Sequence, residues 1–237
     1  MARWRPPVPK RLRPTAPIAA DAILVGDPGR ALLLAQELLE QPKMSNHARG
    51  LWGYGGRTPQ GRELTIQATG MGGPSAALVL ADLAKLGVRR AVRVGSCTVS
   101  DATIEPGEAL FVEEAIAAGG SAAEFGLALG DAALPDEELS EALREAFGPD
   151  GRRAKVASFD SIPADPGALP DAAAAADMQT VAILARARSL GIAAAAVLVA
   201  TEAIGAASPV SDPAASNDVL EEATKRAGRA GAQALES

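Results

Sequence analysis

A glycine-interrupted stretch, Leu64 to Cys97, constrains the possible folds of this chain more than any other part of it. A β-prone run (64–68) ends at a glycine-rich turn (70–74), and Ser75 is expected to cap a helix whose apolar residues recur at helical spacing. A second apolar run (91–95) follows. The pattern predicts a strand, a helix and a second strand in a βαβ unit. Ligands of such sheets bind beyond the carboxyl ends of the strands.

The second strand contains an unexpected charge, Arg93. An arginine in an apolar strand is costly to bury without an anion. It lies three residues before Ser96, with Gly95 between them. A guanidinium group, a hydroxyl group and backbone N–H groups suit a phosphate. A strand at the sheet edge with its arginine in solvent explains the residue equally well, so both interpretations stay open.

A similar arrangement occurs earlier in the chain. The buried-type strand 22–25 runs directly into the turn 26–30, Gly-Asp-Pro-Gly-Arg, and a helix is predicted from Arg30 to residue 40. A helix N-terminus, backbone N–H groups and an arginine at the end of a strand favour an anion site. Arg49, at the start of a segment that resembles a hairpin edge, is by its position alone a surface charge.

The rest of the chain continues the alternation of strands and helices. We expect strands at 107–112, 154–158 and 194–200, and helices at 135–147, 180–190 and 217–235. The Thr201-Glu202 pair follows the last strand, so its carboxylate is expected at the same sheet edge as the arginines. No repeat or composition break divides the chain. The sequence predicts one α/β domain, residues 18–237, after a basic, proline-rich and mobile arm, residues 1–17.

Composition excludes several classes of protein. The chain has 237 residues, 48% hydrophobic and 22% charged, which indicates a globular domain. Its net charge of −6 argues against a general binder of nucleic acids or membrane surfaces. The one cysteine, Cys97, fits a cytoplasmic location and is expected to be buried rather than nucleophilic. One histidine and one cysteine make a metal site improbable, and residues 70–73 match neither a Walker nor a dinucleotide motif. No apolar run reaches membrane-spanning length.

Taken together, these segments resemble the nucleoside phosphorylases of the purine/uridine type, a family that includes related nucleosidases. The matching segments, in chain order, are Gly26-Asp27-Pro28-Gly29-Arg30, Arg49-Gly50, Gly70-Met71-Gly72-Gly73-Pro74-Ser75, Arg93-Val94-Gly95-Ser96-Cys97 and Asp177-Met178-Gln179. The resemblance implies a twisted mixed β-sheet flanked by helices and a homo-oligomer, a dimer or a hexamer built from dimers. It implies reversible cleavage of a nucleoside N-glycosidic bond by inorganic phosphate, with no other cofactor.

The resemblance also assigns roles to individual residues. The phosphate would be held by Gly26, Arg30, Arg93, Gly95 and Ser96, with Arg49 reaching in from the adjacent subunit. The ribose and base would contact Arg11, Met71, Phe159, Ile162, Met178 and Gln179. The catalytic residues would be Arg93 and Glu202, with Asp212 as the weaker candidate for the acid.

The nucleoside half of the site departs from the family pattern. Gln179 stands where the family has a ribose-binding glutamate, and Ile162 where it has a base-stacking aromatic residue, although Phe159 is nearby. Arg11 replaces a histidine that binds the sugar 5′ position, which suggests an anionic 5′ group. Thr201-Glu202 replaces a Ser-Asp pair that protonates purines. The sequence therefore predicts a divergent phosphorylase with an altered nucleoside.

Two other functions remain open from the sequence. A non-catalytic paralogue that binds phosphate or a nucleoside would explain Gln179 and Ile162, whereas the retained phosphate residues oppose it. A hydrolytic nucleosidase would use water in place of phosphate. The dependence of turnover on phosphate would distinguish a phosphorylase from a nucleosidase.

Overall fold

The computed structural model describes residues 9–205 and 213–237. Its sheet is formed by β1 (Asp21–Val25), β2 (Glu40–Asn46), β3 (Gly53–Arg57), β4 (Glu63–Ala68), β5 (Arg90–Val99), β6 (Ala109–Ala117), β7 (Ala132–Ala133), β8 (Arg152–Ser158), β9 (Ala175–Asp177) and β10 (Ala193–Ala203). Its α-helices are α1 (Pro28–Leu38), α2 (Gly72–Leu86), α3 (Glu137–Phe147), α4 (Thr180–Leu190) and α5 (Pro213–Ala234). Short 3₁₀ turns are η1 (Ala48–Gly50), η2 (Gly120–Phe125) and η3 (Pro166–Ala168).

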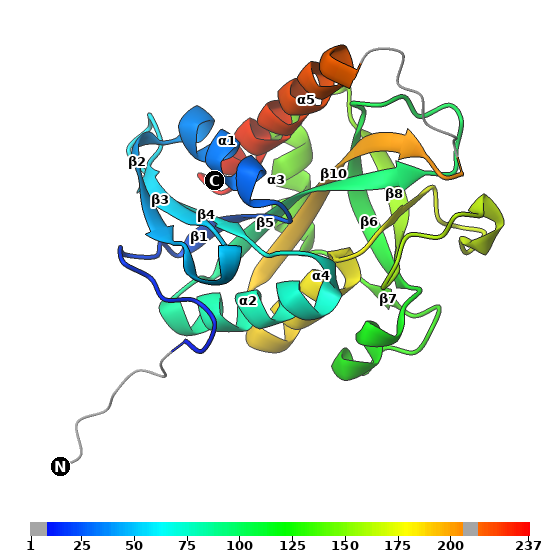
Figure 1. The fold of residues 1–237 in the computed structure, drawn as a ribbon, viewed down its shortest axis with the longest axis horizontal. Coiled ribbons are helices and arrows are strands. Elements are labelled where there is room, and N and C mark those ends of the chain that lie inside the picture. Colours follow the sequence, from blue (N-terminus) through cyan, green and yellow to red (C-terminus); the bar gives the residue numbers. More distant parts are fainter. Residues whose placement is uncertain (1–8, 206–212) are drawn as a thin grey trace.

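The sheet is mixed and partly closed on itself. Its strand order is β10-β6-β8-β9-β5-β1-β4-β3-β2, and β10 also pairs with β5. The pairs β1–β4, β1–β5 and β5–β10 are parallel, whereas β3–β4 and β6–β10 are antiparallel. Five strands, β5, β10, β6, β8 and β9, therefore form a ring from which β1, β4, β3 and β2 extend (Figure 1). This confirms the twisted mixed sheet flanked by helices.

Helices cover both faces of the sheet because the strand side chains alternate. In β1, Ala22 and Leu24 join the core cluster packed under α2 and α4, and Ile23 and Val25 join the cluster packed under α1, α3 and α5. Figure 1 shows α2 and α4 on one side of the sheet, with α1, α3 and α5 on the other. Most of the apolar residues at helical spacing thus lie in one of two large cores, although Leu78 of α2 is exposed.

The predicted βαβ unit is present, but its boundaries differ. Helix α2 begins at Gly72 after an N-cap at Met71, so the prediction that Ser75 caps the helix is wrong. The Ser75 hydroxyl instead donates to the Thr69 carbonyl at 2.6 Å. Strand β5 continues to Val99, which places Ser96 and Cys97 inside the strand rather than after it.

The described part of the basic N-terminal segment contacts the domain. Leu12 is buried, and the backbone N–H groups of Arg11 and Leu12 donate to the Asp82 carboxylate on α2. Arg13 donates its backbone N–H to Asn46 at 2.8 Å. The expected mobile arm is therefore extended but attached over these residues, because buried Asp82 and Asn46 provide acceptors for its backbone. Within the described part of the chain, no helix has the length and apolarity needed to cross a membrane.

Candidate active site

A cavity of about 480 Å³ opens at the carboxyl edge of the sheet. It is bounded by the β1–α1 turn, the β4–α2 turn, the end of β5, the β9–α4 junction and the end of β10. Ten of the residues predicted from the sequence line it, namely Gly26, Arg30, Met71, Arg93, Gly95, Ser96, Ile162, Met178, Gln179 and Glu202. The fold therefore brings together segments that are far apart in the sequence.

The β1–α1 turn places a helix N-terminus and a cation on this cavity. Asp27 is the N-cap of α1 and accepts the Arg30 backbone N–H at 2.9 Å, and Pro28 begins the helix. Burial lowers the pKa of the Arg30 guanidinium, Asp27 raises it in part, and nearby Arg93 lowers it further. The two guanidinium groups are thus close enough to repel each other, and an anion between them would relieve that repulsion.

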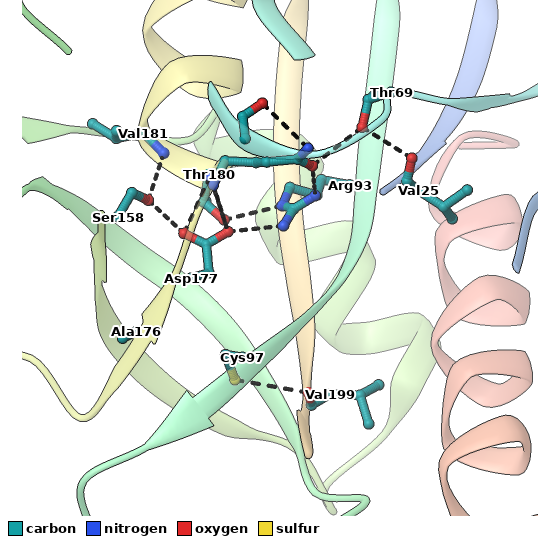
Figure 2. A network of polar contacts seen from close by, with 12 residues as sticks. Val25, Thr69, Arg93, Cys97, Ser158, Ala176, Asp177, Thr180, Val181 and Val199 are labelled. Carbon is teal, nitrogen blue, oxygen red and sulfur yellow. Dashed lines mark hydrogen bonds and ion pairs between the residues drawn. The ribbon is translucent and has the colours of Figure 1, made fainter. Parts of the chain in front are cut away.

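Arg93 is buried, and each of its three guanidinium nitrogens contacts a side chain of this chain (Figure 2). Its Nη2 lies 2.8 Å from Asp177 Oδ2, its Nη1 donates to Gln179 Oε1 at 2.8 Å, and its Nε donates to Thr180 Oγ1 at 3.0 Å. The interpretation of Arg93 as an edge residue in solvent is therefore wrong. A guanidinium group has five N–H donors, so two remain for a ligand.

Asp177 is the main site residue that the sequence analysis did not assign a role. It is 2% exposed and accepts hydrogen bonds from the Ser158 hydroxyl, from the Thr180 hydroxyl at 2.6 Å and from the Gln179 backbone N–H at 3.1 Å. Figure 2 shows it between Ser158 and Arg93. One feature of the sequence could have indicated this role. Asp177 is an acid at the end of a strand, three residues before the start of a helix, and Arg93 needs a negative partner if it is buried.

Gly95 lets the Arg93 side chain reach this network. A Cβ atom at position 95 would lie 2.7 Å from Arg93 Cζ and 2.6 Å from Leu198 Cδ2. Both distances are shorter than normal contacts. A glycine is needed here because the guanidinium group lies over its α-carbon, so Gly95 acts by leaving space.

The other side of the cavity is open and apolar. Met71 is 83% exposed, while Ile162 and Met178 are half-buried. Glu202 is exposed and lies near the end of β10, where it pairs with Thr98 of β5. The register between the two strands shifts between Ala200 and Glu202. Glu202 lines the cavity, and among the described residues its carboxylate has no hydrogen-bond or ion-pair partner.

Cys97 also lines the cavity but is not suited to nucleophilic chemistry. Its thiol is buried and lies 3.8 Å from the Val199 carbonyl (Figure 2). Burial raises the pKa of the Cys97 thiol, and the Asp177 carboxylate raises it further, with only partial opposition from Arg93. The thiolate is therefore strongly disfavoured, as expected for a buried structural cysteine.

Three predicted site residues do not reach this chain's own cavity. Arg49 is exposed in a left-handed turn (φ 62°), and Arg11 lies 4.0 Å from Asp82 on the far end of α2. Phe159, like Ile162, packs against a small separate cluster of buried residues that includes Ile116 and Ile204. Asp212 lies outside the described residues.

A buried arginine network and an exposed carboxylate thus line one cavity at the carboxyl edge of a twisted mixed sheet flanked by helices. The family model described as the phosphorylase superfamily matches residues 21–236, and the chain belongs to this family. This confirms the resemblance read from the motifs.

Individual relatives agree with this assignment. The chain is 42% identical over 81 residues to a DeoD-type purine nucleoside phosphorylase of Oceanobacillus iheyensis and 40% identical over 81 residues to one of Caldanaerobacter subterraneus. Each match spans 34% of the chain and 34% of the relative. A uridine phosphorylase of Vibrio fischeri superposes with a TM-score of 0.81 at 21% identity, covering 92% of this chain and 91% of that one. A purine nucleoside phosphorylase of Toxoplasma gondii superposes with a TM-score of 0.77 at 19% identity, covering 92% of each chain. These two likenesses concern the fold alone.

Proposed function

We propose that this protein catalyses the phosphate-dependent, reversible cleavage of a nucleoside to a free base and a ribose or deoxyribose 1-phosphate. The observation that carries the proposal is the pair of cations, Arg30 and Arg93, on one cavity with the N-terminus of α1. Mutually repelling guanidinium groups beside a helix N-terminus favour a multivalent anion. Inorganic phosphate is the proposed co-substrate, and the proposed reaction needs no other cofactor.

The proposed reaction exchanges one bond for another at the anomeric carbon. A phosphate oxygen forms a bond to that carbon as its bond to the base nitrogen breaks, and the electron pair leaves with the base. Arg30 and Arg93 hold the phosphate on one face of a sugar that carries positive charge in the transition state. A proton reaches the departing base from the Glu202 carboxyl group, which lines the same cavity.

A complete site is proposed to need a second copy of this chain. Arg49 and Arg11 do not reach the cavity of their own chain, and Arg49 is exposed. We propose that a neighbouring subunit in a dimer or hexamer supplies these arginines to the cavity. Light scattering would give the mass of the assembly. An Arg49→Gln variant mixed with a variant defective at Arg93 would recover activity if subunits share sites.

One observation favours a second function, a non-catalytic binding protein. Arg93 is already neutralised by Asp177, and Gln179 carries no charge toward a sugar cation. Such a protein would bind phosphate or a nucleoside without turnover. A nucleosidase that uses water is the third alternative.

The deciding experiment measures release of free base from a panel of nucleosides and 5′-nucleotides, with and without inorganic phosphate. Phosphate-dependent release supports the phosphorylase, and a preference for 5′-nucleotides would support the proposed role of Arg11. Release that is independent of phosphate indicates the nucleosidase. Absence of release from every substrate, with phosphate binding retained in calorimetry, indicates the binding protein.

A further inference from the structure

The amide of Gln179 has polar partners on both of its ends. The residue is 4% exposed. Its Oε1 accepts from Arg93 Nη1 at 2.8 Å and lies 3.1 Å from the Thr69 hydroxyl. Its Nε2 donates to the carbonyl of Gly70 at 2.5 Å and to that of Gly72 at 3.3 Å. The amide is therefore occupied by protein groups and leaves no donor for a ligand.

These surroundings specify an amide rather than a carboxylate. A glutamate at position 179 would keep the contact with Arg93, but its second oxygen would face the carbonyl oxygens of Gly70 and Gly72. A carboxylate has no donor for those oxygens, so the contact would be repulsive. A methionine of similar length would leave both carbonyl groups and one Arg93 N–H without a partner.

The turn that receives this amide carries a wall of the cavity. Gly70 and Gly72 both have positive φ, 74° and 79°, and a Cβ atom at position 70 would lie 2.7 Å from Ser75 Oγ. Met71, between the two glycines, lines the cavity and is the N-cap of α2. The shape of the turn therefore depends on two glycines, on Ser75 and on the Gln179 amide.

We propose that Gln179 is a positioning residue that ties the Arg93 guanidinium to the Gly70–Gly72 turn. Through these hydrogen bonds, Gln179 fixes the position of the Arg93 guanidinium group relative to Met71, which lines the cavity from the turn. The same contacts mean that Gln179 is not used to hold sugar hydroxyl groups, in contrast to the role expected from the family resemblance. The consequence for turnover rests on the proposed function, whereas the tie itself does not.

The test compares two variants with a matched control. Gln179→Met removes the hydrogen bonds at similar volume. Gln179→Glu keeps the contact with Arg93 but places a carboxylate oxygen against the carbonyl oxygens of Gly70 and Gly72. Gln67→Met is the control because Gln67 is also fully buried and donates to the carbonyl groups of Leu51 and Ala68, both at 2.9 Å, without contacting Arg93. Inorganic phosphate is titrated by calorimetry, and amide hydrogen exchange is followed over residues 70–75.

Gln179→Met is expected to weaken phosphate binding at least tenfold and to raise exchange over residues 70–75. Gln179→Glu is expected to raise the same exchange although it retains an acceptor for Arg93. In turnover, KM for phosphate should rise in both variants by more than KM for the nucleoside. Gln67→Met should lower Tm without altering phosphate affinity or the exchange of residues 70–75.

Unchanged exchange over residues 70–75 in both Gln179 variants would overturn the proposal, and so would an equal increase in Gln67→Met. Unaltered phosphate affinity in Gln179→Met would overturn the part that concerns Arg93. If the unsubstituted protein neither binds phosphate nor releases base, the proposed function fails, and the exchange experiment still decides whether the tie exists.

Discussion

The two sides of the cavity are built in opposite ways. On the side that we propose binds the anion (the anion side), Arg93 and Asp177 are buried, and each makes several hydrogen bonds inside the chain. On the side that we propose binds the nucleoside (the nucleoside side), Met71 and Glu202 are exposed and Ile162 is half-buried, and their side chains make no comparable hydrogen bonds among the described residues. The first side is held by hydrogen bonds within the chain, whereas the side chains of the second are more exposed to solvent. This difference agrees with a sequence that retains its phosphate motifs and departs from the family at its nucleoside positions.

The largest expected effect comes from removing the central cation of the anion side. Arg93→Met should lower phosphate-dependent turnover by about 1000-fold, since it removes donors aimed at the anion. It should also lower the free energy of unfolding by about 3–5 kcal/mol, because Asp177 is left as an unpaired buried charge. Urea unfolding and phosphate titration measure the two effects. Adding Asp177→Asn should restore part of the stability and none of the activity; restored activity would contradict the role of Arg93.

Glu202→Gln, on the nucleoside side, should lower kcat while leaving the free energy of unfolding nearly unchanged. Loss of the proposed proton donor is expected to lower kcat by about 100-fold, within the range of general acid catalysis. The free energy of unfolding should change by less than about 0.5 kcal/mol, since the side chain is exposed. Steady-state kinetics with saturating phosphate measure the first effect. An unchanged kcat would assign the proton donation to another group.

Arg30→Gln tests the outer cation of the anion side. We expect about tenfold weaker phosphate binding, because one charge-assisted hydrogen bond is lost while Arg93 remains. Helix α1 keeps its N-cap in this variant, because the Asp27 side chain accepts a hydrogen bond from the backbone N–H of residue 30 and not from its side chain. Arg229→Gln is the control, since Arg229 pairs with Glu37 and Glu222 away from the cavity. Equal phosphate affinity in both variants would argue against an anion between Arg30 and Arg93.

The smallest expected effect is that of Ile162→Val. Removing one methylene group from a partly buried contact costs about 0.8 kcal/mol at most, so KM for the nucleoside should rise by about fourfold or less. Phosphate affinity should stay the same. Kinetics with each substrate varied in turn give both values, and a change in phosphate affinity would show that the two sides are coupled.

Local patterns predicted the elements of the fold better than they predicted the site. Helix α4 runs over Thr180–Leu190 as expected, because Gly191 ends it in the left-handed conformation. The start of α2 was placed too late, since the Ser75 hydroxyl bonds within the preceding turn instead of capping the helix. The cations on the cavity were predicted from motifs. Asp177, 84 positions after Arg93, was not, because no local pattern encodes a partner at that separation.

The lack of space for a side chain at Gly95 makes this position sensitive to any substitution. Any side chain there would displace the Arg93 guanidinium or Leu198. Gly95→Ala would leave the net charge and every ionisable group of the chain unchanged. It would disturb the centre of the cavity through volume alone. Mutational scanning should therefore find position 95 nearly intolerant to replacement, although its residue has no side chain to contribute.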